Sequence, residues 1–159
     1  MATIPSPAPA PSPTATPPQF HPLPINGAYR LSITLGPSCE VVVLRRFHQR
    51  AWDVAVTNQN DLSLLAFVGP ERIFPDRTAG LCSVCGFVSV PPDERVHVLL
   101  EFQEQTDEYL LAYDLQAMDA SLMGDTITGR ALGRFVSLST SAERAECLSD
   151  SHTFTLTPR

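Results

Sequence analysis

The chain has 159 residues, of which 43% are hydrophobic and 18% are charged. This length and composition fit one folded domain with a sizeable core, and they exclude a chain that is disordered throughout. The formal net charge of -6 argues against nucleic-acid binding as the main activity, because an acidic surface repels phosphate backbones. Apolar runs stay well below the roughly 18 residues of a transmembrane helix, so we expect no membrane-spanning segment.

Residues 1–25 differ in composition from the rest of the chain. Nine of the 15 prolines lie between Pro5 and Pro24, and no charged side chain precedes Arg30. Proline fixes φ and lacks a backbone donor, so it neither continues a helix nor fits the centre of a sheet. We therefore predict a disordered, proline-rich arm or linker over residues 1–25 and a single domain over residues 26–159. The arm lacks the basic start and apolar stretch of a secretory signal peptide.

From Asn26 onward the hydrophobic residues alternate with a period of two, which is typical of β-strands. In residues 95–102, for example, Val96, Val98 and Leu100 face one way, whereas most of their neighbours on the other face are polar. Turn-forming residues separate such segments at intervals of about 8–12 residues. The expected strands are residues 28–35, 40–47, 51–57, 62–68, 81–90, 95–102, 108–115, 126–132, 134–140 and 153–157.

Helix signals are scarce. Short helices are expected at residues 115–123 and 141–148, where Ser141 is a candidate cap. Because strands dominate, the sequence predicts an all-β protein. Successive hairpins favour an antiparallel up-and-down β-barrel of about 8–10 strands, since closure of the meander removes exposed edges. A sandwich of two sheets is the alternative.

Two local patterns resemble calycin-type barrels, the group that contains lipocalins, avidins and bacterial metalloprotease inhibitors. Residues 26–31 (NGAYRL) resemble the glycine-x-aromatic entry into the first strand, although Tyr29 stands where lipocalins usually have tryptophan. Residues 124–135 resemble the late strands, in which spaced glycines allow tight curvature. This resemblance implies a closed barrel. The GAYRL segment followed by Cys39 is also similar to the small bacterial protease inhibitors.

The four cysteines allow three arrangements. Because the first and last strands of a closed barrel are neighbours, we predict a disulfide between Cys39 and Cys147. Cys82 and Cys85 form a C-x-x-C within strand-like flanks, so they either pair across a turn or remain thiols. Alternatively, Cys82, Cys85, Cys147 and His152 form a zinc site. The even cysteine count favours an oxidising compartment, secreted or periplasmic.

The sequence gives no sign of catalysis. It contains no G-x-S-x-G, no H-E-x-x-H and no glycine-rich phosphate loop. All 11 basic residues are arginine, which excludes a lysine nucleophile or base. His21, His48 and His97 fall in the arm, in a polar turn and on an outward strand face. We therefore expect a non-enzymatic protein without a cofactor.

These observations predict a binding module for a small apolar ligand or a partner protein. Barrels of about eight strands either fill their interior with side chains or enclose one small ligand. The alternatives are a protease-inhibitor-like barrel and a structural domain with a zinc or C-x-x-C site. The aromatic residues expected to line the interior, or to be ordinary core, are Tyr29, Trp52, Phe67, Phe102, Tyr109 and Tyr113.

Overall fold

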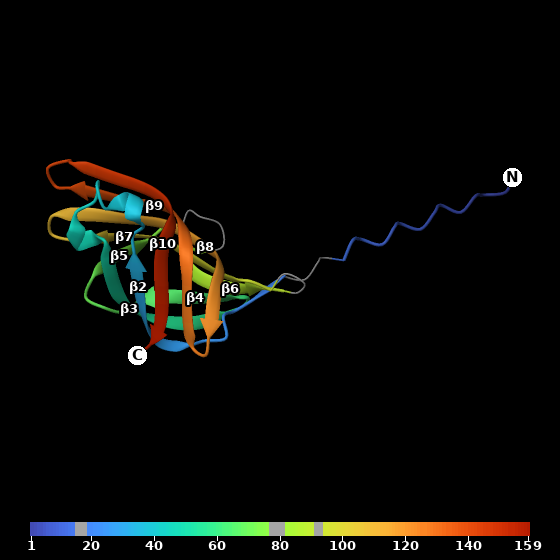
Figure 1. Ribbon diagram of the computed structural model, residues 1–159. Helices are drawn as coiled ribbons and strands as arrows, with labels where there is room; N and C mark the ends of the chain where they lie inside the picture. The colour runs from blue at the N-terminus through green and yellow to red at the C-terminus, as the bar shows by residue number, and fades with distance from the viewer. Residues whose placement is uncertain (15–18, 77–81, 91–93) are drawn as a thin grey trace.

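The computed structural model describes residues 1–14, 19–76, 82–90 and 94–159, and its architecture is all-β. Eight antiparallel strands form a closed barrel (Figure 1). Each strand pairs with the next one in the ring, and the last pairs with the first. The ring runs through β2 (Gly27–Thr34), β3 (Gln49–Gln59), β4 (Leu62–Phe67), β6 (Val84–Ser89), β7 (Val96–Gln105), β8 (Tyr109–Met123), β9 (Thr126–Ser139) and β10 (Arg144–Pro158).

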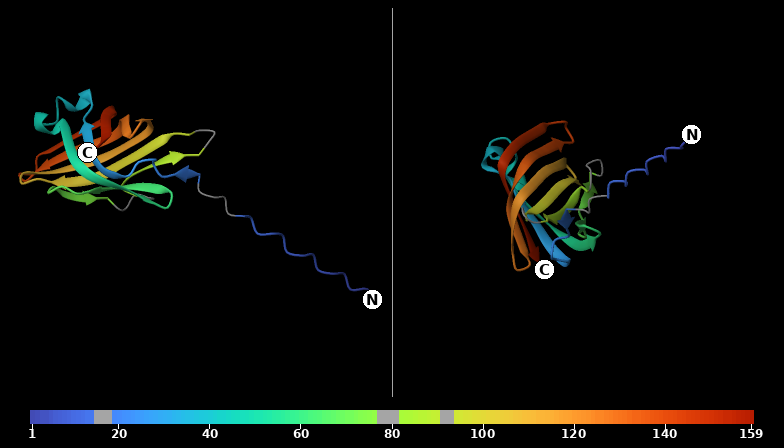
Figure 2. Two further views of the ribbon diagram at one scale, coloured as in Figure 1. Left: turned by 90° about the horizontal axis from the view of Figure 1, so that it is seen from below. Right: turned by 90° about the vertical axis from the view of Figure 1, so that its right-hand side faces the viewer.

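Four short elements lie outside this ring. Strand β1 (Phe20–His21) pairs with the end of β6, and β5 (Arg72–Pro75) pairs with the end of β7. The 3-10 helices η1 (Pro37–Cys39) and η2 (Arg45–Phe47) lie between β2 and β3. This segment and the N-terminal arm lie on opposite sides of the barrel (Figure 2). In the described part of the chain, no helix is long and apolar enough to cross a membrane.

The predicted antiparallel meander is confirmed. Strand β2 closes the barrel against β10, with Leu31 opposite Leu156 and Ile33 opposite Phe154. All four side chains are buried, as the period-two alternation predicts for inward-facing positions. The seam between β4 and β6 is short, with two residue pairs, Ser63 with Gly86 and Leu64 with Cys85.

Residues 40–47, predicted as a strand, do not form one. Strands β2 and β3 pair directly with each other, Thr34 lying opposite Gln49, so the residues between them form a connection without a partner strand. The backbone N–H groups of Val42 and Val43 both donate to the carbonyl of Cys39, which is turn geometry. The hydrophobic run that favoured a strand therefore lies in a loop.

Both predicted helices are also wrong. Residues 115–123 continue β8, where Leu115 pairs with Leu100 of β7 and Leu122 pairs with Ile127 of β9. Residues 141–148 begin as a turn and continue into β10. Alanine, leucine and methionine are good helix formers, but their free-energy preference for a helix is small per residue. Pairing with a strand on each side overrides it.

Strand β9 joins two segments that the sequence analysis separated at Gly133. A Cβ atom at Gly133 would collide with the carbonyl oxygen of Asp114 in β8, so glycine here permits a close approach of two strands.

The start of the predicted strand at residue 81 and the turn at residues 91–93 lie outside the described residues. The predictions for β2, β3, β4 and β7 are confirmed to within a few residues.

The boundary between arm and domain lies before residue 25. Residues 1–14 are exposed and extend away from the barrel, whereas Leu23 and Ile25 are buried. The N–H of Leu23 donates to Ser63 Oγ at 2.8 Å, and its side chain fills the space next to Gly86 where a Cβ would otherwise lie. The last residues of the predicted arm therefore belong to the barrel.

Deletion of residues 1–14 should leave the melting temperature unchanged, because these residues bury no surface in the barrel. Deletion of residues 1–25 should destabilise the fold by about 3–5 kcal/mol, since it exposes the cavity filled by Leu23 and Ile25. Thermal unfolding of both deletions, with Leu23→Ala as a point variant, measures the difference. Equal melting temperatures for the two deletions would contradict the packing of residues 20–25.

Candidate binding site at the barrel mouth

The predicted interior aromatic residues pack on one another. The ring of Trp52 lies 5.2 Å from that of Phe102 and 5.4 Å from that of Tyr113, between centroids. Phe67 lies 4.8 Å from Phe102, and Tyr113 lies 5.0 Å from Phe135. Such contacts are favourable between aromatic rings. They place a continuous cluster of side chains in the centre of the barrel.

The other two predicted residues belong to the same hydrophobic core or pack against it, but within the described residues neither has a ring contact with these four. Tyr29 is buried on β2. Tyr109 is partly buried at the start of β8, where its ring packs against Phe47 of η2 at 5.0 Å. The structure thus brings four of the six predicted residues together, and their role in ligand binding stays a prediction.

A charged pair lies at one end of the aromatic cluster. Glu104, on the same face of β7 as Phe102, is 2% exposed and forms an ion pair with Arg50 of β3. Its second carboxylate oxygen accepts a hydrogen bond from Trp52 Nε1 at 3.2 Å. A buried carboxylate is costly unless it is paired in this way. Apolar side chains at these positions would therefore stabilise the fold at least as well as the ion pair does.

Two donors of this buried cluster are not used. Arg50 Nε and the Tyr113 hydroxyl are buried and have no hydrogen-bond partner in the described part of the chain. Burial, and to a lesser degree the nearby Glu104 carboxylate, raises the pKa of Tyr113, although the adjacent Arg50 guanidinium opposes this shift. The hydroxyl therefore stays protonated and keeps its donor. Unmatched buried donors are uncommon in proteins and require an explanation.

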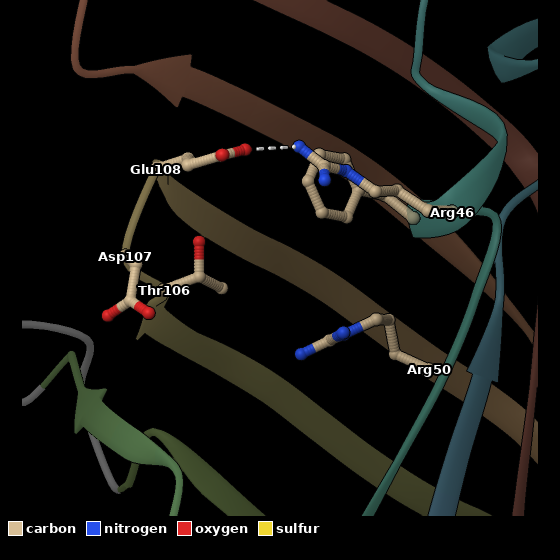
Figure 3. Close-up of a pocket in the computed structure, with 6 residues that line it drawn as sticks. Arg46, Arg50, Thr106, Asp107 and Glu108 are labelled. Carbon is tan, nitrogen blue, oxygen red and sulfur yellow. Dashed lines mark hydrogen bonds and ion pairs between the residues drawn. The ribbon is translucent and has the colours of Figure 1, made fainter.

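A pocket of about 310 Å³ opens beside Arg50, between η2 and the turn that joins β7 to β8 (Figure 3). Arg46 crosses its entrance and donates to Glu108 at 2.9 Å. Arg50 points into the space next to this pair, whereas the Asp107 side chain points away from it. The lining residues are Arg46, Phe47, Arg50, Thr106, Asp107 and Glu108.

Arg46 is held by more than its ion pair. Its guanidinium lies 5.0 Å from the ring centre of Phe47 and 4.9 Å from that of Tyr109. Cation–π contacts of this kind stabilise a guanidinium in one place. Arg46 is therefore fixed at the entrance although more than half of its side chain is exposed.

The loop of residues 36–48, which we call the mouth loop, carries an exposed apolar surface. Val41 is 89% exposed, Val42 is 48% exposed and Leu44 is 47% exposed. Their neighbours Val43 and Phe47 are buried beneath them. Single exposed apolar residues are ordinary, but three of them within four positions of one loop form a local apolar patch on the surface.

Several contacts fix the mouth loop on the barrel. Cys39 forms a disulfide with Cys147 of β10, and the N–H of Gly36 donates to His152 Nδ1 at 3.0 Å. His48 Nε2 donates to the carbonyl of Val43 at 2.9 Å, which closes the loop internally. Its exposed side chains are therefore presented on a constrained backbone.

The cysteines settle two of the sequence predictions. The predicted bond between Cys39 and Cys147 is confirmed, with Cα atoms 5.3 Å apart. Of the two outcomes left open for Cys82 and Cys85, the structure has the disulfide. Within the described residues, Cys82, Cys85, Cys147 and His152 are not brought together as a metal-ligand set. The imidazole of His152 instead bonds the backbone of Gly36 and of Gly133.

Sequence reasoning missed the polar residues of the mouth. One signal was present in β7, because Glu104 occupies the next inward position after Leu100 and Phe102 in a strand of period two. A carboxylate at that position already predicts a charge inside the barrel. No comparable pattern places Arg46 and Arg50 opposite residues of the β7–β8 turn, because that proximity depends on barrel closure.

These features define a closed eight-stranded antiparallel β-barrel with a constrained loop and a pocket at one end. Comparisons with known protein families, with curated proteins and with solved structures give no match. The architecture is compatible with a calycin-like barrel, and membership of that group stays a prediction.

Loss of the bond between Cys39 and Cys147 should destabilise the protein by about 4–5 kcal/mol, because the bond closes a loop of roughly 100 residues. The Cys82–Cys85 bond closes a very short loop, so its loss should cost about 2 kcal/mol in the same entropy model. Urea unfolding of the two double Cys→Ser variants measures both values. A larger loss for the Cys82–Cys85 variant would contradict the expected order.

Acidification should weaken the anchoring of the mouth loop through His152. Burial lowers the pKa of His152, although the hydrogen bond to the Gly133 carbonyl opposes this shift. The unfolded chain therefore binds a proton near pH 6.5 that the folded protein excludes, and stability falls as pH drops below about 6.5. Urea unfolding between pH 5 and 7 measures this slope.

His152→Asn keeps an acceptor for the Gly36 N–H and should reduce the slope. His21→Asn, at an exposed position on β1, is the control. An unchanged slope in His152→Asn would show that other groups carry the pH dependence.

Proposed function

We propose that the protein is a non-enzymatic binding module that recognises a partner protein through the mouth loop. The observation that carries the proposal is the exposure of Val41, Val42 and Leu44 on a loop fixed by the Cys39–Cys147 disulfide. Preorganised loops lose little conformational entropy on binding, so their apolar contacts translate efficiently into affinity.

The charge of the mouth loop indicates the chemistry of the partner. The molecule carries a net charge of -6, yet the loop contains Arg45 and Arg46 against a single carboxylate, Glu40. A partner surface with an apolar patch bordered by carboxylates would complement it. The net charge of -6 disfavours a second copy of this chain as the partner, because two molecules of like charge repel each other.

Three observations support this function over the other predicted ones. A small apolar ligand in the interior would have to displace the Trp52, Phe102 and Tyr113 rings, which contact one another. The hydrogen bonds of His48 and His152 go to backbone groups, as expected for structural rather than catalytic histidines. The backbone at Val42 and Val43 turns, which does not support a protease-inhibitor role based on an extended, substrate-like loop.

The test is a comparison of three forms of the full chain in capture from an extract of the native source. Replacement of Val41, Val42 and Leu44 by serine should abolish capture of the partner, because it removes the apolar contact surface. Met123→Ser, at an exposed position on the β8–β9 turn, should retain it. Thermal unfolding confirms that both variants are folded.

Undiminished capture by the triple variant would contradict the proposal. Saturable binding of a lipophilic fluorescent probe, quenching or shifting Trp52 emission, would instead support the small apolar ligand.

A further inference from the structure

The mouth pocket offers more hydrogen-bond donors than its own acceptors use. Arg46 gives one hydrogen bond to Glu108, and Arg50 gives one to Glu104, although each guanidinium has five N–H donors. Among the donors of Arg50, Nε has no hydrogen-bond partner in the described residues. Their natural complement is an oxygen anion. We propose that this pocket binds a carboxylate group, with Arg46 and Arg50 as its principal donors.

The charge balance of the pocket selects a single negative charge. Glu104 and Glu108 are each paired with one arginine, so neither adds an uncompensated charge. Asp107 also lines the pocket, but its fully exposed side chain points away from it, and its carboxylate lies 3.7 Å from the Arg72 guanidinium, which balances its charge. A ligand with one carboxylate would therefore enter a site that has no net charge and is rich in hydrogen-bond donors. A doubly charged phosphate would leave a larger excess of negative charge on this neutral site than a carboxylate, which disfavours it.

The two guanidinium groups are held in advance of binding. Arg46 lies over the rings of Phe47 and Tyr109, and Arg50 is fixed by Glu104 beneath the pocket. An arginine fixed by ring stacking and an ion pair loses little freedom when it binds a carboxylate. The Phe47 ring also provides an apolar wall next to the site. The pocket therefore suits a carboxylate attached to an apolar or aromatic group.

The site does not require the apolar surface of the mouth loop, so this inference holds or fails separately from the proposed function. The carboxylate can belong to a small molecule or to the C-terminus of a peptide. Trp52 is the sole tryptophan of the chain, and its indole N–H donates to Glu104 next to Arg50. Its indole N–H signal in a ¹H–¹⁵N NMR spectrum therefore reports on occupation of the site.

The experiment titrates the ¹⁵N-labelled full chain with four probes. Benzoate should shift the Trp52 indole signal saturably, whereas neutral benzamide should leave it unchanged and phenyl phosphate should bind at least tenfold more weakly. An acetylated tripeptide with a free C-terminal carboxylate distinguishes the source. Tighter binding of this peptide than of benzoate assigns a peptide carboxylate, and the reverse order assigns a small molecule.

Two variants test the donors. Arg46→Gln should weaken benzoate binding by about tenfold or more, the effect of one charge-assisted hydrogen bond. Arg134→Gln, which removes an exposed arginine paired with Glu146 on the outer wall, should leave it unchanged. Because Arg46 is largely exposed, its replacement should not unfold the protein. Equal shifts with benzamide, no shift with benzoate, or equal loss in both variants would overturn the proposal.

Discussion

The pairing of β2 with β10 is the constraint on which the other features depend. It closes the meander into a barrel and brings the end of β2 beside the middle of β10. Cys39 then lies within disulfide distance of Cys147, and Gly36 lies within hydrogen-bond distance of His152. Residues more than 100 positions apart thus fix one loop. Without closure, that loop would be a free hairpin connection.

The filled interior of the barrel supports the proposal that function lies at the surface. The centre of the barrel is occupied by ring contacts among Trp52, Phe102 and Tyr113, so an internal ligand would compete with packing that stabilises the fold. Several features that packing does not explain lie at the mouth. They are the exposed Val41, Val42 and Leu44, the buried donors, and the ion pair of Arg50 with Glu104.

Much of the fold was predictable, because period-two alternation and turn residues are local signals. The failures had two physical causes. The run from Val41 to Leu44 has strand composition, yet β2 and β3 pair directly and leave it no partner strand. Residues 115–123 have helix-forming side chains, yet they are paired on both sides. Propensity is a local quantity, and in both cases the pairing of distant strands decided the outcome.

The candidate site was less predictable for the same reason. The aromatic interior and the Cys39–Cys147 bond followed from assuming closure, and Glu104 could have been found from the alternation of β7. The approach of Arg46 to Glu108 could not, because two loops at one end of a barrel are related by strand tilt and length rather than by spacing in the chain. Side-chain function at a barrel mouth therefore needs three-dimensional information.

The two ends of the barrel interior are covered by different kinds of side chain. At one end, Leu23 and Ile25 cover the interior with buried apolar side chains, which is the inexpensive solution. At the mouth, the chain places a charged pair against the aromatic cluster and exposes three apolar side chains above it. Both choices lower stability relative to an apolar cover with a polar surface. Because the opposite end shows that this chain can form such a cover, folding alone does not account for the mouth, and this contrast supports the proposal that the mouth serves recognition.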